Sequence, residues 1–200
     1  MDGRPQRHRS AALPPGPRRH RARRAAAGHR PGRALVVCVG RLCRQKGQDV
    51  LLAAWDAVAA RVPGARLALV GDGPDHDALR SRAPESVLLA GAVADAVPWY
   101  QAADLVVLPS RWEGMALAPL EALACGRPVV VTDVDGARES LPPTLAPRCL
   151  VAPEDAAALA RTVTELLLDP LLRESLGRQP SAAGHPARVV PTECRESIHS

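Results

Sequence analysis

Aromatic residues are scarce in this chain of 200 residues, which has no phenylalanine, one tyrosine and three tryptophans. So few rings make a base-stacking platform for single-stranded nucleic acid hard to build. No apolar run approaches about 18 residues, which argues against a membrane-spanning helix. No apolar segment follows the N-terminal charges, which argues against a secretory signal. The hydrophobic content of 46% still suffices for a packed core, so wholesale disorder is not expected.

Lysine is also rare, and the cysteines do not form a pattern. Lys46 is the single lysine beside 25 arginines. The cysteines are odd in number and form no C-x-x-C pair, so we interpret them as reduced, partly buried thiols of a cytosolic protein rather than as disulfides or zinc ligands. The five are Cys38, Cys43, Cys125, Cys149 and Cys194.

The formal net charge of +5 hides two parts of opposite sign. Residues 1–33 carry +9, are broken by proline and glycine and show no hydrophobic periodicity, so we predict a disordered Arg-rich tail. Residues 34–200 carry −4. The tail is compatible with a solvated or non-native extension, with a transit peptide, or with charge-driven binding to nucleic acid or anionic lipid.

Short apolar runs alternate with helical patterns from residue 34 onward. The runs are continuous rather than alternating in apolar residues, which is typical of strands covered on both faces in a parallel sheet. This order predicts an α/β fold, a Rossmann-like open parallel sheet flanked by helices and joined by right-handed crossovers. We expect the strands at 34–40, 66–71, 86–91, 104–110, 128–132 and 149–153, and the helices at 47–62, 75–83, 96–103, 115–125 and 154–168. This domain would cover residues 34–178, followed by a second irregular tail at 179–200.

In open α/β sheets, ligands lie at the carboxyl ends of the strands. After the first predicted strand, Gly40 precedes Arg41 and Lys46 on the loop that enters the first long helix. Helix N-termini offer unpaired N–H groups, so two added cations predict a diphosphate site, with a solvent-exposed loop as the alternative. Gly71 and Gly73 follow the second strand and permit a tight turn close to a ligand, although this G-x-G alone is weak evidence.

Two glutamates follow the fourth predicted strand, Glu113 just before a helix and Glu121 two turns inside it. A separation of about 12 Å along the axis is too wide for a paired acid–base couple acting on one bond. It suits two hydroxyl-bearing ends of one extended ligand, with the backbone N–H groups of residues 114–116 between them. Pro119 fits only if this helix begins close to Ala116.

Four segments in order resemble the nucleotide-sugar-binding half of a family-4 glycosyltransferase (glycosyl transferases group 1). They are VGRLCRQKG, VGDGP, GAV and AADLVVLPSRWEGMALAPLEALACGRPVVVTDVDGARE. The resemblance covers about residues 34–176, and Glu113 and Glu121 fit the family's E-x7-E motif. It implies the C-terminal half of a GT-B fold.

The resemblance implies a role for each site residue. Arg41 and Lys46 would neutralise the donor diphosphate and stabilise the leaving group. Glu113 would bind hydroxyls of the transferred sugar, and Glu121 would bind the ribose. The remaining donor-binding residues would be Gly40, Gly71, Gly73, Val93, Gly114, Met115 and Ala116. The family is retaining and works without a bound metal, so no cofactor is implied, and we interpret the D-x-D at Asp133 as chance.

The chain departs from the family pattern in three places. Met115 and Ala116 stand where the family commonly has an aromatic residue and then glycine. Only the basic tail precedes the first strand, where the family has an acceptor-binding domain, and residues 179–200 do not resemble its closing helix. We therefore expect a donor-binding domain that binds without turnover, truncated or frame-shifted out of a longer enzyme. The alternative is an inactive fragment or a binding module whose tail contacts nucleic acid or anionic membrane.

The expected partners are a nucleotide sugar and an unidentified sugar, lipid or small-molecule acceptor, without specific nucleic acid. A cytoplasmic location is expected, with peripheral contact at the inner membrane face left open. A Ser–His–Asp hydrolase has little support, because Ser110 lacks a G-x-S-x-G context and His76 is the only histidine between Arg33 and Arg178.

Overall fold

The computed structural model describes residues 33–114 and 116–178 of the chain. Apart from Arg33, the two tails predicted from the sequence lie outside these described residues, and so do Met115 and Cys194.

The core of the fold is one sheet of six parallel strands in the order β3-β2-β1-β4-β5-β6. The four inner strands are buried along almost their whole length, which explains their unbroken apolar sequences. The predicted α/β, Rossmann-like fold class is thereby confirmed. The strands are β1 (Leu35–Val39), β2 (Arg66–Val70), β3 (Val87–Gly91), β4 (Leu105–Leu108), β5 (Val129–Thr132) and β6 (Leu150–Val151).

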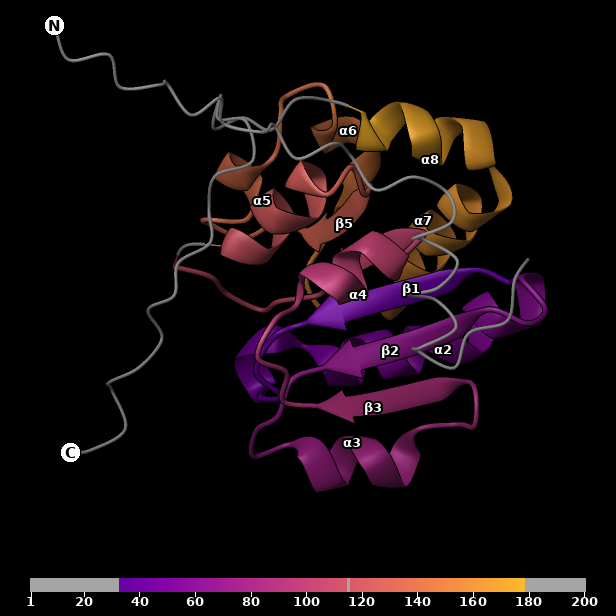
Figure 1. Cartoon of the computed structure of the whole chain (residues 1–200), viewed down its shortest axis with the longest axis vertical. Helices are drawn as coiled ribbons and strands as arrows, with labels where there is room; N and C mark the ends of the chain where they lie inside the picture. Colours follow the sequence, from indigo (N-terminus) through magenta and orange to yellow (C-terminus); the bar gives the residue numbers. More distant parts are fainter. Residues whose placement is uncertain (1–32, 115, 179–200) are drawn as a thin grey trace, which may run out of the picture.

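Helices cover both faces of this sheet (Figure 1), where α4 lies in front of β1 and α2 lies behind the strands. α2 (Gln48–Arg61) packs against α7 (Ala156–Leu168), and α4 (Val97–Ala102) packs against α5 (Leu117–Ala124). α3 (His76–Arg82) connects β2 to β3. The helix predicted at 47–62 corresponds to α2, which buries an apolar stripe made of Val50, Leu51, Ala54, Trp55 and Val58.

Four short helical segments were not predicted: η1 (Arg44–Lys46), η2 (Arg138–Ser140), α6 (Ala146–Cys149) and α8 (Pro170–Gly177). α8 carries a recognisable start signal, since the Asp169 side chain accepts a hydrogen bond from Leu172 N at 2.9 Å and proline follows at the first helical position. The last strand was predicted too long, at 149–153. Cys149 belongs to α6, and the chain leaves the sheet before Pro153, which has no N–H for the ladder.

The strand order reverses direction between β1 and β4. The chain moves outward from β1 to β2 and β3, then returns to β4 on the other side of β1 and continues to β5 and β6. In open α/β sheets, ligands bind at such a switch point, outside the carboxyl ends of the two strands. The two loops here are residues 40–47 and 109–116, which contain most of the predicted site residues. In Figure 1 the carboxyl ends of β1, β2 and β3 point to the left of the view.

Candidate functional site

The loops after β1 and β4 are packed backbone against backbone. Gly47 has φ 64°, and a Cβ on it would lie 2.0 Å from the carbonyl oxygen of Pro109, so only glycine fits. Two hydrogen bonds connect the same loops: Arg111 N donates to Gln45 O at 2.8 Å, and Gln45 Nε2 donates to Trp112 O at 3.1 Å. This contact brings the loop that carries Arg41 and Lys46 beside the loop that carries Glu113.

Lys46 and Glu113 form an ion pair in which the Lys46 Nζ is 2.7 Å from Oε1 and 2.9 Å from Oε2 of the carboxylate. The Ser110 Oγ donates a further hydrogen bond to Glu113 Oε1 at 2.6 Å. The Glu113 side chain is only 7% exposed, and that of Lys46 is 26% exposed. A nearly buried carboxylate thus has a cation and a hydroxyl as partners, as burial of a charge requires.

Arg41 extends into solvent from the same loop. Its guanidinium makes no hydrogen bond or ion pair with any residue that the structure describes, whereas its carbonyl oxygen accepts a bond from the buried Gln48 Nε2 at 2.9 Å. A Cβ on Gly40 would contact the aliphatic part of Lys46 at 3.6 Å. The loop therefore has a fixed backbone, one paired cation (Lys46) and two exposed cations, Arg41 and Arg44, of which we predicted Arg41 as a site residue.

Gly71 and Gly73 lie against the loop after β1. A Cβ on Gly71 would meet Gly40 O at 2.1 Å, and one on Gly73 would meet Leu42 O at 2.3 Å. Both glycines are thus needed for the contact between neighbouring loops. Their direct contact with a ligand stays a prediction.

Glu121 lies inside α5, where its Oε2 accepts a hydrogen bond from the Tyr100 hydroxyl at 2.9 Å. Tyr100 is fully buried on α4. Burial first, and the Glu121 charge second, raise the pKa of Tyr100 far above its ordinary value, so the phenol stays a neutral donor. The Oε1 atom of Glu121 has no hydrogen bond to the described residues.

Sequence reasoning missed Ser110 and Tyr100 as partners of the two glutamates. The sequence indicates these two residues only weakly: Ser110 lies three residues before Glu113, and Tyr100 is the only tyrosine of the chain. Neither signal shows which carboxylate the hydroxyl faces, because the Tyr100–Glu121 contact joins two different helices.

The remaining predicted residues lie around these pairs. Gly114 is exposed, with open space where a Cβ would be, and Val93 is 36% exposed in the turn after β3. Ala116 is buried, and α5 begins immediately after it at Leu117, close to where Pro119 required the start. Pro119 is the third residue of the helix, where a missing N–H leaves no intrahelical bond unmade.

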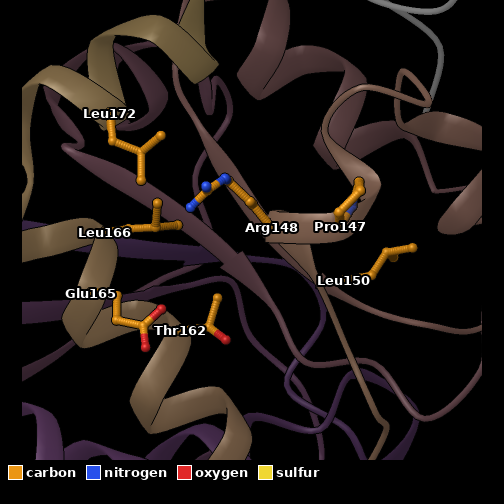
Figure 2. A pocket seen from close by; sticks show the side chains of 7 residues that line it. All are labelled: Pro147, Arg148, Leu150, Thr162, Glu165, Leu166 and Leu172. Atoms are coloured by element: carbon orange, nitrogen blue, oxygen red, sulfur yellow. The ribbon is translucent and has the colours of Figure 1, made fainter.

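A pocket of about 300 Å³ lies elsewhere, between α6, β6, α7 and α8 (Figure 2). It contains none of the predicted site residues; its lining is Pro147, Arg148, Leu150, Thr162, Glu165, Leu166 and Leu172. The Asp133 carboxylate of the D-x-D sequence is paired with Arg138, whose Nε is 2.7 Å from Oδ1. Helices long and apolar enough to cross a membrane are absent from the described part of the chain.

Comparison with known proteins identifies the family. Residues 33–169 match the family described as Glycosyl transferases group 1. The lipopolysaccharide core biosynthesis mannosyltransferase LpcC of Rhizobium leguminosarum bv. viciae is 35% identical over 162 residues, which are 76% of this chain and 46% of the relative. A GDP-mannose-dependent alpha-(1-6)-phosphatidylinositol monomannoside mannosyltransferase of Mycolicibacterium smegmatis is 34% identical over 168 residues, 77% of this chain and 43% of the relative.

Comparison with solved structures shows the same fold. HepE of Anabaena, in complex with UDP and glucose, superposes with a TM-score of 0.71 at 25% identity. The superposition covers 82% of this chain and 46% of the HepE chain. Sucrose-phosphate synthase of Thermosynechococcus elongatus has a TM-score of 0.67 at 31% identity, covering 79% of this chain and 42% of its own. The chain spans less than half the length of these relatives. It belongs to the group 1 glycosyltransferases (glycosyltransferase family 4), and its described residues form the C-terminal, donor-binding domain of their GT-B fold.

Proposed function

We propose that this domain binds a nucleoside diphosphate sugar at the switch point between β1 and β4, as the donor half of a retaining glycosyltransferase. The observation that carries the proposal is the Lys46–Glu113 pair at the switch point of the sheet. A cation suited to phosphate and a nearly buried carboxylate suited to sugar hydroxyls lie side by side there.

The cations would serve the diphosphate. The ammonium of Lys46 has three N–H donors and uses two of them on Glu113, so one remains for a phosphate oxygen. The solvent-exposed guanidinium of Arg41 supplies a second cation on the same loop. During transfer, the bond between the sugar C1 and the β-phosphate oxygen breaks. Both cations would stabilise the negative charge that develops on that oxygen.

The carboxylates would serve the hydroxyl groups of the donor. Glu113 would accept hydrogen bonds from the transferred sugar, while Ser110 keeps its carboxylate oriented. Glu121 would accept from the ribose through Oε1, since Tyr100 occupies Oε2. The backbone N–H groups of residues 114–116 would contact the sugar and the phosphates, and Gly40, Gly71, Gly73 and Val93 would line the remaining donor surface.

Donor identity and acceptor belong to the proposal as well. One relative's name includes GDP-mannose, and HepE was solved with UDP and glucose, so both a guanine and a uracil donor are candidates. Because the chain spans less than half of its relatives, we propose donor binding for this chain and sugar transfer for an assembly that also holds an acceptor. The acceptor and the cytoplasmic location stay predictions from the sequence.

Isothermal titration calorimetry on the full 200-residue chain with UDP-glucose, GDP-mannose and ADP-glucose tests the proposal. We expect one of them to bind, and the matching nucleoside diphosphate to displace it. Lys46→Met should weaken that binding about thirtyfold, because a charge-assisted contact with the phosphates is lost.

Arg44→Met is the matched control, because it removes one positive charge from the same loop at an exposed position. It should change the affinity less than about threefold, as expected for general electrostatic attraction alone. A folded wild-type chain that binds none of the three donors would contradict the proposal. Equal losses in the two variants would contradict the role of Lys46.

A further inference from the structure

We infer that Arg111 is a positioning residue of the donor site: it holds the Lys46 loop and the Glu113 loop in register without touching the ligand. The part of this inference that concerns affinity rests on the proposed function. The part that concerns the geometry of Lys46 does not.

Arg111 uses four of its five side-chain N–H donors inside the protein. Nη1 and Nη2 donate to the two carboxylate oxygens of Asp49, both at 2.8 Å. Nη1 also donates to Arg44 O at 2.8 Å, and Nε donates to Glu154 Oε1 at 2.6 Å. The side chain is only 15% exposed. A guanidinium committed in this way has little left for a donor sugar.

The partners of Arg111 surround Lys46 along the chain. Arg44 and Gln45 precede Lys46, and both accept hydrogen bonds from Arg111, one from its side chain and one from its backbone N–H. Asp49 lies in the first turn of α2, three residues after Lys46. Glu113 follows Arg111 by two residues. One side chain thus anchors the segments on both sides of the cation and the loop that carries the carboxylate.

We refer to Arg111 with its side-chain partners Asp49, Arg44 O and Glu154 as the Arg111 clamp. Through Glu154 this clamp reaches a third loop. Among the described residues, Glu154 is the only non-glycine residue with a positive φ, at 61°. Such a backbone costs free energy in a residue with a Cβ and persists only when its surroundings hold it. The Glu154 side chain is held by its charge-assisted hydrogen bond with Arg111. Arg111 therefore ties together the loops that follow β1, β4 and β6.

A lysine cannot replace this arrangement, because an ammonium lacks the planar fork that bonds a carboxylate and two further acceptors at once. The bonds from Arg111 lower the pKa of Asp49, and the bonds to Asp49 and Glu154 raise the pKa of Arg111, so the Arg111–Asp49 pair stays charged at neutral pH. Other Arg–carboxylate pairs of the fold, such as Arg138–Asp133, do not connect the Lys46 loop to the Glu113 loop.

Lys46 is a built-in reporter, because it is the only lysine of the chain. Labelling the full chain with lysine that carries ¹³C at Cε alone gives one side-chain NMR signal from the carbon next to the ammonium, which reports the ion pair without any ligand. In Arg111→Gln we expect this signal to move toward the position and line width of a free lysine. In the same variant, the affinity for UDP or GDP should fall about tenfold.

Two more variants keep the test decisive. Asp49→Asn removes one acceptor of the fork and should move the Lys46 signal in the same direction by less, which covers the case that Arg111→Gln does not fold. Arg173→Gln is the matched control, because Arg173 also bonds backbone carbonyls, those of Leu166 and Leu167, but far along the chain from both loops. It should lower the melting temperature and leave the Lys46 signal unchanged.

An unchanged Lys46 signal in folded Arg111→Gln or Asp49→Asn would overturn the inference, whatever the ligands do. A wild-type chain that binds no nucleotide would overturn the proposed function and leave the NMR result to decide the role of Arg111. Where nucleotide binds, Lys46→Met combined with Arg111→Gln should lose no more affinity than Lys46→Met alone. Additive losses would show that Arg111 does not act through Lys46.

Discussion

The two carboxylates of the proposed donor site are held by different kinds of structure. Glu113 and its partner Lys46 lie on loops, and their geometry depends on contacts between those loops. Glu121 and its partner Tyr100 lie on α5 and α4, two helices that pack against each other. We refer to them as the loop pair (Lys46–Glu113) and the helix pair (Tyr100–Glu121).

The difference lies in what supports each pair. The loop pair depends on a glycine without space for a Cβ, on the Arg111 clamp and on hydrogen bonds between two irregular segments. The helix pair depends on burial, since the tyrosine is a fully buried residue of the core. The loop pair should therefore be sensitive to changes at residues that never meet the ligand, while the helix pair should respond mainly to changes in its own side chains.

The largest effect is expected for Gly47→Ala. The new Cβ would need a left-handed backbone and would lie 2.0 Å from Pro109 O, so the two loops must separate. We expect the free energy of unfolding to fall by about 3 kcal/mol or more, and nucleotide binding to be lost. Urea unfolding measures the first effect and calorimetry the second.

Gly114→Ala is the matched control on the opposite loop, because nothing lies within 4 Å of the Cβ that it would add. Its free energy of unfolding should stay within about 0.5 kcal/mol of wild type. Similar losses of unfolding free energy in Gly47→Ala and Gly114→Ala would show that the close contact at Gly47 does not stabilise the two loops.

The helix pair should respond to Glu121 itself. Glu121→Ala leaves the buried Tyr100 hydroxyl without its acceptor, which should lower the free energy of unfolding by about 2 kcal/mol. Glu121→Gln keeps a carbonyl acceptor and should unfold close to wild type. Both variants lose the carboxylate, so both should bind nucleotide about tenfold more weakly. Equal stability of the two variants would refute the hydrogen bond to Tyr100 as their difference.

The fold was largely predictable, because strands buried on both faces need continuous apolar runs and α2 needs an apolar stripe. The short segments were not, since α6 spans four residues and β6 two, too few for a period to show. The strand order also lies beyond local patterns. It follows from which strands pair, and the reversal between β1 and β4 is what places the two loops together.

The sequence predicted individual residues of the proposed site but not the hydrogen bonds and ion pairs between them. Lys46 and Glu113 could be selected because each follows a strand and matches a motif, yet their contact spans 67 positions in sequence. No sequence pattern indicated the positioning role of Arg111, because this role depends on its bonds to Asp49 and Glu154, which lie 62 and 43 positions away. Such pairings arise only when the loops meet in the folded chain.

The smallest expected effect is a dependence of the loop pair on acid. Arg111 lowers the pKa of Asp49 below its value of about 3.9 in an unfolded chain. This carboxylate therefore adds stability that is fully present above about pH 4 and is lost as the pH falls through the lower, folded pKa. Because the Asp49 side chain is 40% exposed, the contribution should stay below about 1 kcal/mol.

The free energy of unfolding, followed from pH 5 to pH 2, should thus fall less steeply in Asp49→Asn than in wild type. Asp133→Asn is the comparison, because Arg138 lowers the pKa of Asp133 in the same way outside the clamp. Both variants should flatten the stability curve, but only protonation of Asp49 weakens the bonds between Asp49 and Arg111. Below pH 4 the ¹³C signal of Lys46 should therefore move further in wild type and in Asp133→Asn than in Asp49→Asn, where only the other carboxylates titrate. A Lys46 signal that stays constant while stability falls would show that the clamp and the ion pair are independent.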